Sequence, residues 1–485
     1  MEFEQQKERI KEHFCQTSDL EIKEFTTQNN QSVLLVFLAN IIDQLLLTSS
    51  VIAPLQDLPS PSEDNTDIAD LAMEKIISFS QVSVAQDFDT MAQQVLNGFC
   101  AVYFANSDKV LIVECAKWIV RTPTEPPTSA VVKGPREGFV EDFVTNITLI
   151  RKRLKTPKLK IDEMVIGRKT NSQVRIIYLS DTADPKVVNA IKAKLQKIDI
   201  DGIVDSNYLA EFLQTGNHVI FKQVGTTEKP DVAVAKILEG RVAILVDGSP
   251  IVLTLPYILL EDLQSSNDYY TNPARATFLR YLRLFSGVIA IMLPGLYVAL
   301  LCHHAKAIPI KLLITITNSI QGIPIPPLLE TLFIIFLFEI LYEASLRMPR
   351  HMGLALSIVG ALILGDTAVK AGLISPPAVL IVALTGVMNY TIPELSNQTS
   401  FLRLVFTIIG GFMGILGIVL GGLFLIAYLA NMDSYGSPYL SPFAPNNPTD
   451  KKDGLVRQNI PQMGLRPKSI KNINKRRQKN DRTDY

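Results

Sequence analysis

The spacing of apolar residues along the chain changes near residue 270. Before that point, short runs of Val, Ile and Leu alternate with polar and amphipathic segments, which is typical of strands and helices in an α/β domain. After Arg283, the apolar stretches become long and almost free of charge, and they cover residues 284–302, 328–338, 353–374, 376–393 and 404–432. The pattern predicts a water-soluble part followed by a helical membrane domain over residues 271–432.

The soluble part contains an internal repeat with an offset of about 141 residues. "VLLVFLANIID" from Val33 matches "VRIIYLSDTAD" from Val174, and in both copies a run of strand formers is followed by an Asp at the same position. "GFCAVYFANSDKVLIVE" from Gly98 matches "GRVAILVDGSPIVLTLP" from Gly240, and each segment is expected to form a hairpin. Chance similarity between α/β segments is the alternative. We predict two similar α/β lobes, over residues 1–122 and 161–270.

A linker and an amphipathic helix are expected between the lobes, over residues 123–160. Pro and Thr are frequent at its start, and apolar residues then recur at helical spacing within residues 136–155. These apolar positions are Phe139, Phe143, Ile147, Ile150 and Leu154. The end of the helix and the next loop are basic, with Arg151, Lys152, Arg153, Lys155, Lys158 and Lys160. A solvated surface explains them, and contact with anionic lipid or an acidic neighbouring subunit is the alternative.

Charge supports this division of the chain. The whole sequence has 47 Lys plus Arg and 47 Asp plus Glu, so its formal net charge is zero. The acidic excess lies in the soluble part, the basic excess lies in residues 433–485, and the membrane part has few charges of either sign. A chain without an overall basic excess is not expected to bind nucleic acid. The start of the chain lacks the apolar core of a signal peptide, so we expect cytoplasmic lobes.

The number of membrane crossings has to be even if the lobes and the basic tail are both cytoplasmic. Basic residues favour the cytoplasmic side, and they follow the second apolar stretch (Arg347, Arg350) and fill the tail. Five apolar stretches cannot then all be single spans. A re-entrant segment near residues 322–342 would give four spans. A bend in the long last stretch would give six, and the sequence leaves both possibilities open.

Ionisable residues within the apolar stretches are candidate functional residues, because charge is costly at membrane depth. Asp366 and Lys370 are four residues apart, so they can form a pair or lie at the mouth of a water path. Glu330, Glu339 and Glu343 form an acidic series that favours a cation route. Gly410, Gly414, Gly417 and Gly421 have the small-residue spacing that lets helices approach closely, within one subunit or between subunits.

Motifs of enzyme chemistry are missing from the sequence. It has no GxxxxGK, GxGxxG, HExxH or GxSxG motif. Its cysteines, Cys15, Cys100, Cys115 and Cys302, lack metal-site spacing. Cys100 and Cys115 fall on neighbouring predicted strands and could touch, although free buried thiols are the simpler interpretation. We expect no enzyme activity and no bound metal or cofactor.

Six segments resemble one protein family, the A subunits of GerA-type spore germination receptors (the GerABKA family). They are "GPREGFVEDFVTNITLIRKRLK" from Gly134, "IDIDGIVDSNYLAEFL" from Ile198, "EGRVAILVDGSPIVL" from Glu239, "FEILYEASLRMPR" from Phe338, "SIVGALILGDTAVKAGLISPP" from Ser357 and "GSPYLSPFAP" from Gly436. The resemblance implies a multi-pass protein of the spore inner membrane with cytoplasmic lobes. It also implies a permease-like B subunit and a lipoprotein C subunit as partners, and assembly into a homo-oligomeric, germinant-gated ion channel.

The sequence therefore favours an α+β and α-helical membrane protein. It would contain two similar α/β lobes, a transmembrane helical domain of four to six spans and a basic tail over residues 433–485. We expect a gate on residues 353–374, with candidate pore and gate residues Ser357, Ile358, Leu362, Leu364, Asp366 and Lys370. The alternatives are a transporter component and a scaffold subunit that docks partners without conducting ions.

Overall fold

The computed structural model describes residues 2–58, 67–77, 82–105, 107–117, 133–216, 219–347 and 367–478. The chain forms two compact units. One contains Met1–Tyr257, Asp433–Ser437 and Ile460–Tyr485, and the other contains Ile258–Met432 and Pro438–Asn459. We call them the lobe unit and the helical unit and describe each by itself.

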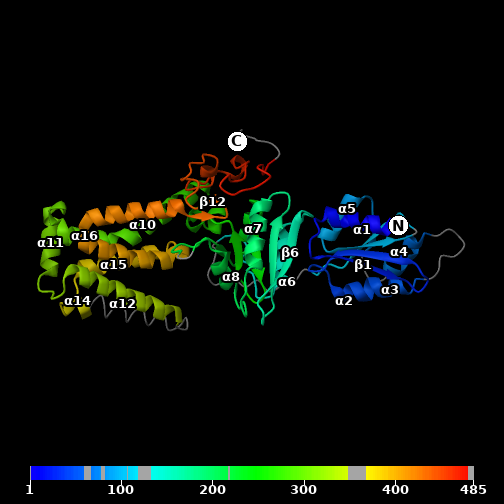
Figure 1. Ribbon diagram of the computed structural model, residues 1–485, viewed down its shortest axis with the longest axis horizontal. Coiled ribbons are helices and arrows are strands. Elements are labelled where there is room, and N and C mark those ends of the chain that lie inside the picture. The colour runs from blue at the N-terminus through cyan, green and yellow to red at the C-terminus, as the bar shows by residue number, and fades with distance from the viewer. Residues whose placement is uncertain are drawn as a thin grey trace. The chain divides into compact units, whose positions relative to one another are not determined.

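The first lobe is a five-stranded antiparallel sheet in the order β1-β2-β4-β5-β3. Its strands are β1 (Leu20–Thr26), β2 (Ser32–Leu38), β3 (Val82–Ala85), β4 (Phe99–Phe104) and β5 (Val110–Glu114). Helices α1 (Glu2–His13) and α5 (Phe88–Leu96) cover one face; α2 (Gln44–Leu47), α3 (Ala53–Gln56) and α4 (Ile68–Ile77) cover the other (Figure 1). Side chains of β2 alternate between the two cores, so the continuous apolar run from Val33 is a strand buried on both faces.

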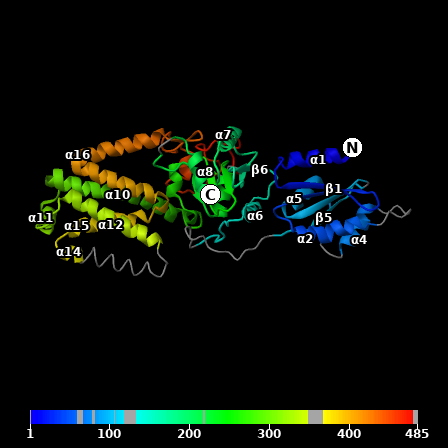
Figure 2. The ribbon, with the colours of Figure 1, turned by 60° about the horizontal axis from the view of Figure 1, so that its bottom comes forward.

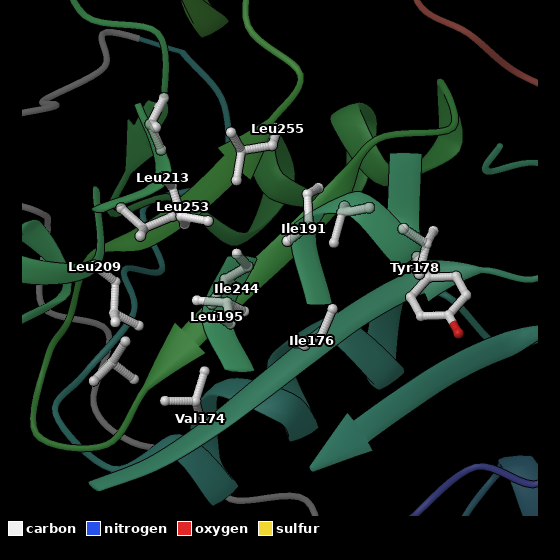
Figure 3. Close-up of a cluster of buried hydrophobic side chains, with 14 of the residues drawn as sticks. Val174, Ile176, Tyr178, Ile191, Leu195, Leu209, Leu213, Ile244, Leu253 and Leu255 are labelled. Atoms are coloured by element: carbon white, nitrogen blue, oxygen red, sulfur yellow. The ribbon is translucent and has the colours of Figure 1, made fainter. Parts of the chain in front are cut away.

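The second lobe repeats this arrangement, with the strand order β6-β7-β9-β10-β8. Its strands are β6 (Leu159–Ile166), β7 (Ser172–Leu179), β8 (Gly225–Thr227), β9 (Val242–Val246) and β10 (Val252–Leu255). Helices α7 (Pro185–Gln196) and α8 (Ser206–Leu213) pack on one face, and α6 (Phe143–Arg153) and α9 (Pro230–Leu238) pack on the other. Figure 3 shows the first of these cores, where Val174 and Ile176 of β7 face Ile191 and Leu195 of α7.

The predicted repeat and both predicted hairpins are confirmed by these matching sheets. The aspartate shared by the two copies has a local cause. Asp43 accepts hydrogen bonds from the backbone N–H groups of Leu45 and Leu46 at the start of α2, and Asp184 accepts one from Lys186 N at the start of α7. A carboxylate at this position caps the helix that follows the central strand, so both lobes begin that helix in the same way.

The C-terminal tail completes the second lobe. In the first lobe, Ala116, the second residue after β5, bridges to Ile42 and lies against Gly98. In the second lobe, Asn472 of the tail occupies the corresponding place, bridging to Ala183 and lying against Gly240. The next residue repeats the match: Lys117 N donates to Ile41 O, and Ile473 N donates to Thr182 O, both at 2.9 Å. In the second lobe, a segment distant in sequence thus takes the place that residues close after β5 occupy in the first lobe.

Among the described residues, the helical unit contains five helices of more than two turns. They are α10 (Pro273–His303), α11 (Ile310–Ile320), α12 (Pro327–Arg347), α15 (Pro376–Asn389) and α16 (Ser396–Asn431), and α14 (Ala368–Lys370) is a single turn. The 3-10 helices η2 (Leu259–Leu263) and η3 (Ser266–Tyr269) precede α10. Within the described ranges, two helices are long and apolar enough to cross a membrane, Pro273–His303 and Pro393–Asn431. The short hairpin β11 (Asp433–Ser434) and β12 (Ser437–Pro438) follows α16.

Helix α16 reverses direction at Gly414. The backbone of this glycine has a φ of 63° and a ψ of −151°, which are not helical angles. Across the turn, Gly421 lies beside the ring of Phe406, whereas a straight helix would separate these residues by about 22 Å. The positive φ requires glycine, because a side chain would strain the backbone there. Helix α16 is therefore a helical hairpin with two arms (Figure 2). From the rise per residue of an α-helix, each arm is about 26 Å long.

The remaining helices run in definite directions along this bundle. The start of α12 meets the start of α15, because Ser375 N donates to the Glu330 carboxylate. Farther along, the rings of Tyr342 and Tyr390 lie 6.1 Å apart, so α12 and α15 run parallel. The first arm of α16 runs parallel to α10, with Gly410 against Gly295 and Gly414 against His304. Arg347 and Thr367, the described residues on either side of segment 348–366, are thus at opposite ends of the bundle.

Three local expectations differ from the observed elements. The linker helix begins at Phe143, because Asp142 caps it by accepting from Thr145 N, so Phe139 precedes the helix. Phe139 nevertheless packs into the same core as Ile147 and Ile150. The second apolar stretch continues to Arg347, because its acidic residues are accommodated within a helix. Helix α11 was not predicted; its mixed sequence "IKLLITITNSI" is the signal that was missed.

Candidate functional site

Glu330 is the most deeply buried acidic residue of the predicted series. Its side chain lies on the first turn of α12 and is 0% exposed. One carboxylate oxygen accepts a hydrogen bond from the backbone N–H of Ser375, the N-cap of α15. The other oxygen, Oε2, has no hydrogen-bond partner among the described residues. The carboxylate thus lies at the N-terminus of α15, where the helix dipole favours negative charge.

Tyr297 of α10 lies beside this carboxylate. Its ring packs in an apolar cluster with Ile334, Ile374 and Ala378, and only 8% of its surface is exposed. Within the described residues its hydroxyl has no hydrogen-bond partner, and Ile374 of the same cluster directly precedes Ser375. Three helices, α10, α12 and α15, therefore bring three oxygen-bearing side chains together in an apolar surrounding. Sequence reasoning singled out Glu330 and missed Tyr297 and Ser375.

The other two predicted acids on α12 have arginine partners. Glu339 forms an ion pair with Arg403 of α16, whose side chain is 4% exposed. Glu343 pairs with Arg347 one turn later on the same helix, at 2.6 Å, and both side chains are exposed. Sequence reasoning did not include Arg403, although a lone arginine in an apolar helix was a usable signal.

Most predicted gate residues fall outside the described residues. Ser357, Ile358, Leu362, Leu364 and Asp366 belong to segment 348–366. Lys370 is described, at the end of α14, where it is exposed.

The predicted glycine positions lie at helix contacts inside this chain. A Cβ at Gly410 would overlap the backbone carbonyl of Gly295, so α10 and α16 touch backbone to backbone. Gly414 forms the reversal, while Gly417 and Gly421 face Ile409 and Phe406 of the opposite arm. Close approach of helices explains Gly410, Gly417 and Gly421, whereas the positive φ at the reversal explains Gly414.

A buried charge cluster at the start of α10 was not predicted. Arg280 Nε donates to Asp268 at 3.1 Å, and Arg280 Nη1 donates to the Asp453 carboxylate at 3.0 Å. Arg283 also donates to both oxygens of Asp268, at 2.8 and 2.9 Å. Burial raises the pKa of Asp268, but the hydrogen bonds and charges of Arg283 and Arg280 outweigh burial and leave this pKa below its ordinary value. The cluster ties residues 438–459 to the first turns of α10.

The basic residues at the end of α6 have partners within the lobe unit. Arg151 is buried and pairs with Asp19, so a solvated surface is wrong for this residue. Lys152 and Arg153 both pair with Glu137. Lys155 donates to Asn97 Oδ1 at 2.9 Å. Interactions within this chain therefore account for much of a basic cluster for which lipid was one alternative.

The cysteines are free thiols, and Cys100 and Cys115 are buried. Burial, followed by neighbouring charges, raises the pKa of the Cys115 thiol to about 12. In the ranges that the structure describes, no three His, Cys, Asp or Glu side chains are grouped so that they could hold a metal ion.

Comparison with known proteins gives a consistent result. Residues 8–469 match the family "Bacillus/Clostridium GerA spore germination protein". The chain is 34% identical to spore germination protein KA of Bacillus subtilis (strain 168) over 469 residues, which cover 96% of this chain and 86% of that protein. It is 31% identical to spore germination protein GerLA of Bacillus cereus, with 96% and 95% covered. An uncharacterized membrane protein of B. subtilis, YfkQ, is 34% identical, with 91% and 86% covered.

Among solved structures, the N-terminal domain of the A subunit of the Bacillus megaterium spore germinant receptor GerK3 is 27% identical. It matches with a TM-score of 0.40 over 51% of this chain and 91% of that chain. The family match spans both the lobe unit and the helical unit. Members of this family are receptor subunits rather than enzymes, they act in receptor complexes, and the similarity to YfkQ together with the long apolar helices makes this chain a membrane protein. The chain belongs to the GerA spore germination protein family, as the A subunit of a germinant receptor.

Proposed function

We propose that this A subunit assembles with copies of itself in the spore inner membrane as a germinant-gated ion channel or signal transmitter. A permease-like B subunit would sense the nutrient, and a lipoprotein C subunit would complete the receptor. Binding of the germinant shifts the assembly from a closed to an open form, which requires that the germinant bind the open form more tightly.

The observation that carries this proposal is the set of ionisable residues inside the helical unit. Glu330 is fully buried, and the ion pair between Glu339 and Arg403 joins α12 to α16 within the bundle. Charges in a membrane domain usually face protein or water and mark routes of ions. The two buried or paired acids, Glu330 and Glu339, thus support a cation route along α12.

The gate is proposed on residues 353–374, with Ser357, Ile358, Leu362, Leu364, Asp366 and Lys370 as the candidate residues. In this arrangement a bulky Ile358, Leu362 or Leu364 forms a constriction that closes by dewetting. Single cysteines along this segment, tested with a membrane-impermeant thiol reagent, are expected to show periodic protection. Uniform inaccessibility would contradict the assignment.

Six spans, with the lobes and the tail in the cytoplasm, fit the helical unit better than four. The tail segment from Ile460 lies in the same compact unit as the lobes, which supports a shared side of the membrane and an even number of crossings. The two arms of α16 on either side of Gly414 would supply two of these crossings.

Purification of the full chain, sizing in detergent and ion flux in liposomes test the proposal. An oligomer that conducts monovalent cations supports the channel. A monomer without flux favours the scaffold, in which another subunit conducts, and substrate-coupled uptake favours a transporter component. Glu339→Gln, which breaks the pair with Arg403, is expected to change the flux, whereas Glu343→Gln on the exposed face is the matched control.

A further inference from the structure

Glu330 differs from the other acids of α12 in its lack of a counter-charge. Glu339 and Glu343 each pair with an arginine, whereas no ion pair of Glu330 is found in the described part of the chain. Its only hydrogen-bond donor there is Ser375 N, and Oε2 is left without a partner although the side chain is 0% exposed. Buried carboxylates are normally paired, fully hydrogen-bonded or bound to a cation. Among the described residues, Glu330 meets neither of the first two conditions.

A second buried oxygen next to Glu330 has the same deficit. The Tyr297 hydroxyl, on a side chain that is 8% exposed, also lacks a hydrogen-bond partner among the described residues. The Tyr297 ring packs in the same apolar cluster as Ile334, one turn after Glu330, and Ile374, the residue before Ser375. The cluster therefore holds two buried unsatisfied oxygens, from α10 and α12, close to the N-cap of α15.

We propose that Tyr297, Glu330 and Ser375 form a binding site for one monovalent metal cation. All three donors are oxygens, which suit alkali cations rather than transition metals. The site contains one carboxylate and two neutral hydroxyls, and the N-terminus of α15 offsets part of the negative charge. A single positive charge therefore balances it, while a divalent ion would leave excess positive charge in an apolar interior. The use of this site as a station for conducted ions rests on the proposed function, but cation binding does not.

The test measures thermal unfolding of the full chain in detergent at constant ionic strength, with NaCl or KCl exchanged for N-methyl-D-glucamine chloride. A cation that binds only the folded form raises the unfolding midpoint with concentration. The midpoint of the wild-type chain is expected to rise with Na⁺ or K⁺. The midpoint should rise equally in Glu343→Gln, which removes an exposed carboxylate on the same helix. In Glu330→Gln the midpoint should not change with cation concentration.

Tyr297→Phe gives a second, milder variant in case Glu330→Gln does not fold. It removes only the hydroxyl, so the cation response should remain but require a concentration roughly tenfold higher, as for the loss of one charge-assisted contact. A flat wild-type response, or a cation response that is unchanged in both variants, would overturn the site. An equal Glu330-dependent response to CaCl₂ would overturn the monovalent assignment.

Flux measurements in liposomes separate this site from the channel proposal. A Glu330-dependent response to Na⁺ or K⁺ without any flux leaves the site in place and removes the channel function. Flux without such a response leaves the channel in place and removes the site.

Discussion

Arg151 and Asp19 form a buried, two-pronged ion pair between segments that are distant in the sequence. Arg151 Nε donates to Asp19 Oδ2 at 2.9 Å, and Nη2 donates to Oδ1 at 2.8 Å. The guanidinium also donates to Thr17 Oγ1 and to the backbone carbonyls of Thr156 and Leu159. Because Asp19 precedes β1 and Arg151 belongs to α6, this pair fastens the first lobe to the second.

Breaking the pair from one side is expected to destabilise the lobe unit strongly. Arg151→Ala leaves the Asp19 carboxylate buried without a counter-charge, which costs about 3–5 kcal/mol. Denaturant unfolding of the full chain in detergent, followed by circular dichroism, measures this loss. Lys152→Ala is the control, because its exposed pair with Glu137 contributes about 1 kcal/mol or less. Equal losses of unfolding free energy in both variants would show that the buried pair contributes no more to stability than the exposed pair.

Docking of the tail on the second lobe predicts a site-specific effect on proteolysis. Gly240 has a φ of +97°, and a Cβ there would lie 2.9 Å from the Cβ of Asn472. Gly240→Ala is therefore expected to push the tail away and to speed trypsin cleavage at basic tail residues such as Lys471 and Lys475.

Gly248→Ala is the matched control for tail release. This glycine has a similar φ of +83°, but a Cβ there would meet nothing within 4 Å. Both variants share the backbone strain of about 1–2 kcal/mol, so a difference in cleavage rate reports the contacts that a Cβ at Gly240 makes with Asn472 of the tail and with Thr182. Faster cleavage in both variants would indicate general destabilisation instead.

The charge cluster at the start of α10 predicts a loss of stability in acid. The folded-state pKa of Asp268 is below the ordinary value of 3.8. The ionised carboxylate therefore contributes fully to the free energy of unfolding above pH 3.8, and this contribution is lost as the pH falls through the lowered pKa. Unfolding midpoints measured from neutral to acidic pH check this. Asp268→Asn should lower the unfolding midpoint at neutral pH and make it fall less steeply in acid. Asp108→Asn, at an exposed loop position, should leave the pH dependence of the midpoint unchanged. An unchanged acid limb in Asp268→Asn would contradict the prediction.

Backbone contact between α10 and α16 predicts that their glycines tolerate no side chain. In Gly410→Ala, the new methyl group overlaps the carbonyl of Gly295, and overpacking of this kind costs about 1–3 kcal/mol. The thermal midpoint in detergent should fall accordingly. Gly386→Ala on α15 is the control, because a Cβ there meets nothing within 4 Å and alanine favours the helix. A stable Gly410→Ala variant would mean that the helices can separate without cost.

Several features were readable from the sequence because they depend on neighbouring residues. The period of apolar residues identified β2 and β7, and the aspartates at the same position in both copies proved to be helix caps, Asp43 and Asp184. The repeat predicted two sheets, and both have the same strand order. The loss of charge after residue 283 located the helical unit. Each of these signals is local, since caps, strand alternation and hydropathy act over a few residues.

Tertiary structure decided where distant segments meet. Hydropathy gave one long stretch at residues 404–432, and only the backbone at Gly414 shows that it folds back on itself. The basic run at the end of α6 suggested a surface, yet Arg151 is buried because Asp19 supplies its counter-charge. Composition showed a basic tail, but not that Asn472 completes the second lobe. Such outcomes depend on contacts between residues far apart in the sequence, whose shape and charge are matched only when the chain has folded.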